Sequence, residues 1–291
     1  MINLTRHEAL TRGETVGCRY RLLLPQAALR GRDGVRLGTA TGTSLDFHDY
    51  RDYHPGDDLR HLDWSVYARS DRQVIKLFRE EVAPHLDLII DVTGSMDLAN
   101  GVKSTAAIYL AAACAAAATQ AGCSRTIWLA GQQLKTLPDS GAAPQLWPSF
   151  AFNATIAPVA ALIHGGQRWR RHGVRIFISD LLWPDDPLPL INRLADGAAA
   201  LTVIQLLTHD EQDPQPEGAC RLQDVESGDY ADLLINENAC NAYRTALARH
   251  REGWSAACRM HGASFVAVEA EQTLQSSRLI PLERCQLLAP I

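Results

Sequence analysis

Nearly continuous apolar runs recur along the second part of the chain. They are HLDLIID (85–91), RTIWLA (125–130), RIFISD (175–180), LTVIQLL (201–207) and SFVAVEA (264–270). Runs of this length without polar alternation are typical of strands buried on both faces of a parallel sheet. Helical stretches separate several of them, such as the alanine-rich 104–124 and the longer 238–262. Strands that alternate with helices predict an open α/β sheet with right-handed crossovers.

The chain before residue 85 has a different pattern. Glycines and other turn-forming residues are frequent between 31 and 58, which indicates loops around short strands. The stretch 71–81 fits either a strand or a short helix, and 221–235 is expected to form a hairpin. We therefore predict three parts, which are an N-terminal segment over 1–84, an α/β domain over 85–270 and a C-terminal tail over 271–291.

Composition narrows the class of protein. With 291 residues, of which 46% are hydrophobic and 21% charged, the chain can bury a core. Its net charge of −5 gives no basic footprint for DNA or RNA, so no nucleic-acid partner is expected. The seven cysteines are scattered without a C-x-x-C pair, and residues 1–15 lack the layout of a signal peptide. These features favour a reducing cytoplasm.

The alanine-rich stretch 104–124 carries no charge over a length that could cross a bilayer. Most of its residues are alanine, which contributes little to membrane insertion but has the highest helix propensity. Small side chains also let neighbouring backbones approach closely. We therefore expect a buried helix pressed against the sheet, and no membrane span.

Two of the predicted strands end in an aspartate, Asp91 and Asp180. Ligands of open α/β sheets bind beyond the carboxyl ends of the strands, so both carboxylates are candidates for a site there. Thr93 and Ser95 add hydroxyls in the sequence D-V-T-G-S. Mixed carboxylate and hydroxyl oxygens suit Mg²⁺, which keeps several waters. Alternatively, these residues form only a strand end and the N-cap of the next helix.

The D-V-T-G-S sequence resembles the D-x-S-x-S metal-ion-dependent adhesion site (MIDAS) of von Willebrand factor A-like domains, with Thr93 in the place of the first serine. The resemblance implies an open, mostly parallel, Rossmann-like sheet flanked by helices. It implies a Mg²⁺ or Mn²⁺ site whose ligands are Asp91, Thr93, Ser95, Thr155 and Asp180. Asp180 matches the aspartate that follows a buried strand in that family, although the family's next glycine is absent. Thr155 matches the family's distant threonine, with Asn153 as the alternative.

A second, longer resemblance lies upstream. The run from Arg51 to Arg69 is similar to the R-x-Y-x-P-G-D-D-x-R-x-I-D-W-x-x-x-A-R signature of the domain of unknown function 58 family. The matching residues are Arg51, Tyr53, Pro55, Gly56, Asp57, Asp58, Arg60, Asp63, Trp64, Ala68 and Arg69, with Leu62 in the isoleucine place. The resemblance extends from about residue 35 to beyond residue 210.

The arginines and aspartates of this signature are expected to form ion pairs, and Trp64 to bury a flat face. The signature is then a structural clasp between the β- and loop-rich N-terminal segment and the α/β body, or a docking surface for a partner, and both roles can hold. In the family this segment precedes a von Willebrand factor A-like domain. Members are commonly encoded beside MoxR-type AAA+ ATPases, which implies such an ATPase as the partner.

Enzymatic motifs fail on their spacing. GVKST (101–105) lacks the adjacent glycine and lysine of a P-loop. If Asp91 were a phosphate-transferring aspartate, a second aspartate would be needed two residues later, where Thr93 stands. Ser95 lacks the flanking glycines of the G-x-S-x-G elbow of serine hydrolases. The ten histidines form no H-E-x-x-H pair. The chain is therefore not expected to be an enzyme.

Together these patterns predict a cytoplasmic, non-enzymatic adaptor with a chaperone-like role. A Mg²⁺ with an open coordination position would accept an Asp or Glu carboxylate of a partner protein. The family resemblance implies work with a MoxR-type AAA+ ATPase in the assembly or maturation of another complex. Two alternatives stay open: a metal-dependent hydrolase that activates water with the same carboxylates, and a structural scaffold with an empty metal site.

Overall fold

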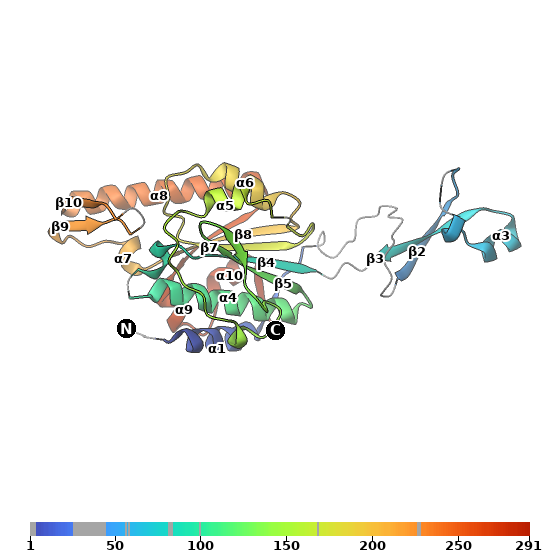
Figure 1. Ribbon diagram of the computed structural model, residues 1–291, viewed down its shortest axis with the longest axis horizontal. Helices are drawn as coiled ribbons and strands as arrows, with labels where there is room; N and C mark the ends of the chain where they lie inside the picture. Colours follow the sequence, from blue (N-terminus) through green and yellow to red (C-terminus); the bar gives the residue numbers. More distant parts are fainter. Residues whose placement is uncertain are drawn as a thin grey trace. The chain divides into compact units, whose positions relative to one another are not determined.

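The protein is described by a computed structural model that covers residues 4–25, 45–80 except 56 and 58, and 84–291 except 99, 168, 226 and 227. The chain divides into two units. The larger contains residues 1–25 and 84–291, and the smaller contains residues 26–83 (Figure 1).

The larger unit is built around a six-stranded sheet with the strand order β11-β8-β7-β4-β5-β6. The strands are β4 His85–Asp91, β5 Ser124–Ala130, β6 Leu134–Thr136, β7 Val174–Ser179, β8 Ala200–Leu207 and β11 Ser264–Glu269. All neighbours are parallel except β6, which pairs antiparallel with β5. The mixed α/β class and the five predicted strands are therefore confirmed. Burial on both faces holds for β4, β7 and β8, whereas β5 and the edge strand β11 are mostly half-buried, and β6 is an addition to the predicted strands.

Helices cover both faces of this sheet (Figure 1). On one side lie α1 Arg6–Gly17, α4 Val102–Gln120, α9 Ala270–Gln275 and α10 Ile280–Arg284, and on the other lie α5 Val159–His164, α6 Pro187–Ala195 and α8 Glu237–Met260. Strand β4 alternates between two apolar clusters, with Leu88 and Ile90 in one and Ile89 in the other. The hydrophobic core thus consists of two apolar clusters, one on each face of the sheet.

Helix α4 has the length and hydropathy of a membrane span, yet 83% of its apolar window is buried. It lies between the sheet and α1. A Cβ placed on Gly13 of α1 would come within 2.3 Å of the Tyr109 carbonyl oxygen, and one on Gly17 within 2.3 Å of that of Ala113. The small residues of both helices allow this close approach, so burial in the core accounts for the alanine-rich sequence.

Both ends of the chain pack on the α/β body, which differs from the predicted boundaries. Strand β1 Tyr20–Leu22 pairs antiparallel with β12 Leu288–Pro290, a pairing that no local pattern could indicate. Helix α1 begins with a capping box between Thr5 and Glu8. Residues 4–25 therefore belong to the larger unit, and residues 271–291 form helices and a strand rather than a separate tail.

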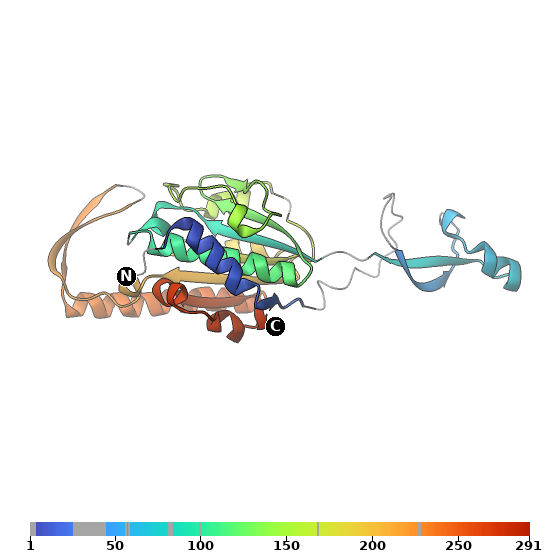
Figure 2. The same cartoon turned by 90° about the horizontal axis from the view of Figure 1, so that it is seen from below.

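The remaining elements of the larger unit are short or peripheral. They are the 3₁₀-helices η2 Gly94–Asp97 and η3 Pro144–Leu146, helix α7 His209–Gln212, and the strands β9 Gly218–Gln223 and β10 Tyr230–Ile235. Strands β9 and β10 form the predicted hairpin, which pairs with no strand of the central sheet. Figure 2 shows this hairpin as an arch that rises from the N-terminal end of α8 and curves back over the helix.

The smaller unit contains a pair of antiparallel strands. Strands β2 Leu45–Asp52 and β3 Val74–Glu80 pair with each other, and η1 Leu59–His61 and helix α3 Trp64–Ser70 lie between them in the chain. Within the stretch 71–81, which fitted a strand or a helix, residues 74–80 therefore form a strand. Asp63 caps α3, because its Oδ1 accepts from the backbone N–H groups of Ser65 and Val66 at 2.8 and 3.2 Å.

Candidate functional site

Asp91 and Asp180 lie at the same edge of the sheet because β4 and β7 are neighbouring parallel strands. Ile90 pairs with Ile178, so Asp91 is level with Ser179, and Asp180 follows one residue beyond. Both aspartates are buried, with exposures of 0% and 1%. The predicted meeting of the two carboxylates at the carboxyl end of the sheet is therefore observed.

Asp91 is bonded to hydroxyls and a backbone amide. Its Oδ1 accepts from the backbone N–H and the hydroxyl of Thr93 at 2.9 and 2.7 Å, and its Oδ2 accepts from the Ser179 hydroxyl at 2.6 Å. The hydroxyls of Thr93 and Ser95 lie 3.0 Å apart. The oxygens of Asp91, Thr93 and Ser95 thus form one connected cluster.

This cluster bears on the helix-capping alternative. Thr93 stands at the N-cap position of η2, but its side chain makes no capping hydrogen bond and turns to Asp91 instead. Helix α4 begins after Gly101, which has no side chain to cap it. The hydroxyls are therefore directed at the carboxylate rather than at a helix end.

The carboxyl of Asp91 is in an unfavourable electrostatic environment. Burial raises its pKa to about 7, and the charge of Asp180 contributes in the same direction. Hydrogen bonds from Ser179 and Thr93 lower the pKa but do not offset these two effects. Among the described residues no cationic side chain bonds to Asp91, so its negative charge lacks a protein counter-ion.

Asp180, in contrast, is paired with a buried lysine. The Lys103 ammonium donates to Asp180 Oδ2 at 3.0 Å and to Glu211 Oε1 at 2.5 Å. Burial alone lowers the pKa of Lys103, but the charges of Asp180 and Glu211 outweigh burial and raise this pKa above its ordinary value. Lys103 is fully buried, so this side of the site contains a permanent positive charge.

Lys103 and Glu211 are absent from the site predicted from the sequence, although each carries a signal. Lys103 is the one charged residue between Asp97 and Arg125, in a segment otherwise suited to full burial. Such a charge must be paired. Glu211 closes a capping box with Thr208 at the start of α7, just beyond β8.

Thr155 comes close to this cluster through the backbone. Its neighbour Ala154 forms a parallel bridge with Thr93 and accepts a hydrogen bond from the Gly94 N–H at 2.9 Å. The Thr155 side chain is exposed, and its hydroxyl accepts from Gln132 Nε2 at 3.0 Å. The structure thus brings the predicted loop to the site, but no hydrogen bond joins the Thr155 hydroxyl to the Asp91 oxygens. The side chain of Asn153, the alternative ligand, is also exposed.

The residue after Asp180 adopts a conformation usual for glycine. Leu181 is fully buried and has φ = 59°, in the left-handed region that a branched side chain rarely occupies. This is the position at which the resembling family has glycine. The Leu181 carbonyl lies 2.7 Å from His250 Nε2, and its N–H donates to the Ser179 hydroxyl at 3.0 Å. Leu181 therefore adopts a backbone conformation that glycine would adopt without strain.

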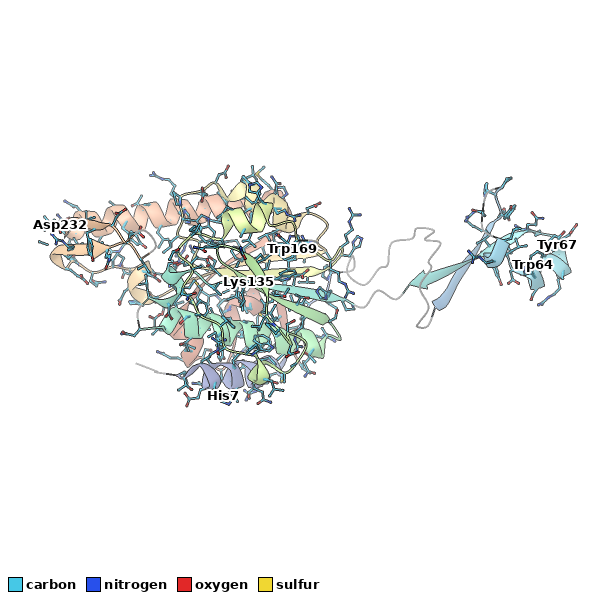
Figure 3. All side chains as sticks on the ribbon, viewed as in Figure 1. His7, Trp64, Tyr67, Lys135, Trp169 and Asp232 are labelled. Atoms are coloured by element: carbon cyan, nitrogen blue, oxygen red, sulfur yellow. The ribbon has the colours of Figure 1, made fainter. Side chains whose placement is uncertain are left out.

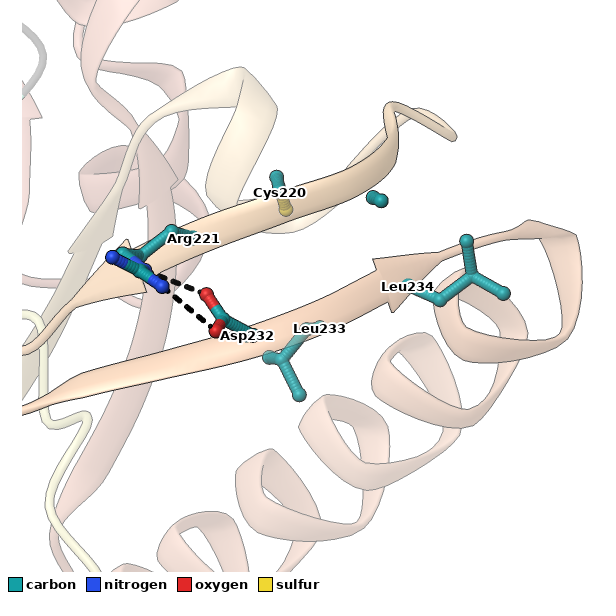
Figure 4. Close-up of a pocket in the computed structure, with 6 residues that line it drawn as sticks. Cys220, Arg221, Asp232, Leu233 and Leu234 are labelled. Atoms are coloured by element: carbon teal, nitrogen blue, oxygen red, sulfur yellow. Dashed lines mark hydrogen bonds and ion pairs between the residues drawn. The ribbon is translucent and has the colours of Figure 1, made fainter.

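The β9–β10 hairpin reaches the candidate site through Val225, which lies just after β9. A Cβ placed on Gly94 would come within 3.1 Å of Val225 Cγ1, so the two residues are in close contact. The hairpin carries exposed apolar side chains, including Tyr230 and Leu234, and a two-bond ion pair between Arg221 and Asp232 (Figure 4). The exposed side chain of Val225 therefore lies beside the loop that carries Thr93 and Ser95.

The signature residues of the smaller unit form part of the predicted ion-pair network. Arg51 donates to Asp57 with two bonds, Nη1 to Oδ2 at 2.8 Å and Nη2 to Oδ1 at 2.7 Å. Arg51, with the backbone N–H of His54, holds the pKa of Asp57 down at about 2. The bonds fix the turn that follows β2.

Other signature residues make local contacts. Asp63 caps α3 and accepts from the Tyr50 hydroxyl at 3.0 Å, and Arg69 Nε donates to the Ser65 carbonyl. Trp64 is 60% exposed, and it starts a helix of seven residues that has no buried position (Figure 3). Within the described residues of the smaller unit, the expected burial of its flat face is therefore not found. Tyr53, Pro55 and Arg60 lie in or beside the turn between β2 and α3, and Gly56 and Asp58 lie outside the described residues.

The donor set at the larger unit's site fits a hard divalent cation. Among the described residues no three His, Cys, Asp or Glu side chains are grouped to hold a metal by themselves. A metal here would rely on one or two carboxylates, hydroxyls and water, the kind of coordination that Mg²⁺ accepts. The buried Asp91 without a protein counter-ion is the feature that such an ion would neutralise.

Comparison with solved structures gives low similarity. BatB from Bacteroides thetaiotaomicron is 10% identical, with 70% of this chain and 98% of that chain covered and a TM-score of 0.34. The ArnB paralog VWA2 from Sulfolobus acidocaldarius is 17% identical, with 46% and 38% covered and a TM-score of 0.28. Scores at this level carry no argument about fold or function.

Comparison of sequences is more informative. The uncharacterized proteins Rv1480 of Mycobacterium tuberculosis and Mb1516 of Mycobacterium bovis are each 25% identical over 258 residues, which cover 82% of this chain and 79% of the relative. The profile of the family described as "Protein of unknown function DUF58" matches residues 49–253. Because this match spans more than half of the chain and includes both the signature and the strand-end aspartates, the protein belongs to the DUF58 family.

Proposed function

We propose that this protein is a non-enzymatic adaptor of the von Willebrand factor A-like type, which recognises a partner protein through a divalent cation. Asp91, Thr93 and Ser95 would hold the cation, with Asp180 and Thr155 completing its surroundings. A bound Mg²⁺ would supply a Lewis-acidic position for an Asp or Glu carboxylate of the partner. The chain's own residues would orient the ion and leave one side of it accessible.

The observation that carries this proposal is the environment of Asp91. A fully buried carboxylate, bonded to the hydroxyls of Thr93 and Ser179 and close to the charge of Asp180, is costly without a cation. The hydroxyl of Ser95 extends the cluster toward a half-buried position. A small ion would offset the cost and leave its outer face toward solvent.

The absence of a free catalytic group in this network supports an adaptor rather than a hydrolase. Lys103 and Glu211 are bonded to each other, and Lys103 also to Asp180. Among the described residues of the network no histidine or unpaired carboxylate other than Asp91 stands ready as a general base. The site is suited to binding a carboxylate rather than to activating water.

The surroundings of the site support a protein as the ligand. Exposed apolar residues of the β9–β10 hairpin, among them Leu222, Val225 and Tyr230, could contact a partner whose acidic residue reaches the ion. The family resemblance supports a MoxR-type AAA+ ATPase as this partner. In the smaller unit, the exposed Trp64 supports the signature as a second docking surface for the same partner.

The proposal is tested by pull-down of a MoxR-type AAA+ ATPase from the same organism. With Mg²⁺ present we expect wild type and the control Asp185→Ala, an exposed aspartate of the same unit, to retain the ATPase. EDTA or Asp91→Asn should reduce retention at least about tenfold, because the carboxylate bridge is lost. Retention that survives both treatments would show that no metal bridge is involved.

A further inference from the structure

The candidate site contains its own cation. The Lys103 ammonium is fully buried and joins Asp180, at the end of β7, to Glu211, in α7 after β8. Lys103 lies in the first turn of α4, and α4 is packed between the sheet and α1. Its ammonium therefore cannot withdraw to solvent, as a surface lysine would.

The charges of this cluster have a defined sum. Three carboxylates, of Asp91, Asp180 and Glu211, and one ammonium, of Lys103, together carry −2 when all are ionised. One divalent cation neutralises this sum. Without Lys103 the same residues would carry −3.

We propose that Lys103 is a fixed internal cation that sets how strongly this centre binds a divalent cation. The inference rests on the proposed function. The positive charge of Lys103 repels an incoming cation, and this repulsion limits the affinity of the site for the cation. The hydrogen bonds of Lys103 at the same time hold Asp180 and Glu211 in place. A site with limited affinity exchanges its ion, which makes the contact with a partner reversible.

The physical reason is the low effective dielectric of a buried site. Charges within such a cluster interact much more strongly than exposed charges do. A change of one unit of charge beside the site should therefore alter the cation affinity at least about tenfold, whichever residue carries the change. A purely structural lysine would not produce this dependence on charge.

The experiment is a calorimetric titration of chelator-treated full-length protein with MgCl₂. Four proteins are compared: wild type, Lys103→Met, Glu211→Gln and the double variant. Lys103→Met makes the sum of charges one unit more negative than in wild type, and Glu211→Gln makes it one unit less negative. The double variant has the same sum as wild type. Glutamine can keep the capping box with Thr208, so Glu211→Gln preserves the start of α7.

We expect Lys103→Met to bind Mg²⁺ at least about tenfold more tightly than wild type, and Glu211→Gln at least about tenfold more weakly. The double variant should return to within about threefold of wild type. Lys135→Met, at an exposed lysine of β6, is the control and should leave the affinity unchanged. If Lys103→Met fails to fold, the comparison of wild type with Glu211→Gln and the double variant still decides.

Equal affinities of wild type, Glu211→Gln and Lys103→Met would overturn the inference about Lys103 and leave the metal-dependent function standing. Weaker binding by both Lys103→Met and the double variant would also overturn it, because the lysine would then have only a structural role. If wild type itself gives no heat and no melting-point shift with Mg²⁺, both the inference and the proposed function fail.

Discussion

Asp180→Ala is expected to lower the free energy of unfolding by about 3–5 kcal/mol, the usual cost of breaking a buried ion pair by removing one partner. Lys103 would remain fully buried with Glu211 as its remaining carboxylate partner in this network. The variant also removes the negative charge of Asp180 from beside Asp91, and the loss of this repulsion stabilises the folded protein. Asp91 can already reduce that repulsion by taking up a proton, so the loss at Lys103 dominates.

The measurement is urea denaturation of wild type and Asp180→Ala at about pH 6 in chelator, where metal binding makes no contribution. Asp185→Ala is the matched control, since Asp185 is exposed a few residues along the same segment, and its stability should change by less than about 0.5 kcal/mol. Equal stability of Asp180→Ala and Asp185→Ala would mean that the Lys103 ion pairs do not stabilise the fold.

The second large effect concerns the pH dependence of stability. In chelator above about pH 7, Asp91→Asn is expected to be more stable than wild type by up to about 4 kcal/mol. The pKa of Asp91 in the folded protein, about 7, lies above its ordinary value of 3.8. The stability that this raised pKa gives to the folded protein is therefore fully present below about pH 4, decreases above it, and is lost as the pH rises through about 7.

The amide introduced by Asp91→Asn suits the existing hydrogen bonds. Its oxygen can accept from the Thr93 N–H and hydroxyl, and its nitrogen can donate to the Ser179 hydroxyl. Mg²⁺ should raise the stability of wild type and not that of Asp91→Asn, which reverses or narrows the difference. A difference between the two proteins that is independent of pH would show that Asp91 remains ionised in the metal-free fold.

Local patterns were sufficient for the centre of the molecule. The buried strands of the sheet appear as apolar runs, and parallel order places their carboxyl ends at one edge. The same pattern predicts that Asp91, Thr93, Ser95 and Asp180 lie at one edge of the sheet. Family resemblance added the loop of Thr155, whose neighbour Ala154 bridges Thr93.

Long-range contacts could not be read in the same way. The pairing of β1 with β12 joins residues near opposite ends of the sequence, and neither three-residue strand has a pattern of its own. No local pattern assigns Lys103 to the site, because its partners Asp180 and Glu211 are 77 and 108 positions away in the sequence. The residue type of Trp64 predicts a buried face, whereas within the smaller unit this residue starts a short helix without a buried position and is exposed.

The central claim is that a divalent cation binds where the oxygens of Asp91, Thr93 and Ser95 meet at the carboxyl end of the sheet. The most direct measurement is the anomalous scattering of crystals grown in saturating Mn²⁺. We predict an anomalous peak beside the Asp91 carboxylate, on the side of Ser95, that disappears in Asp91→Asn. Crystals whose manganese lies elsewhere, with the Asp91 carboxylate in contact with protein groups alone, would contradict it.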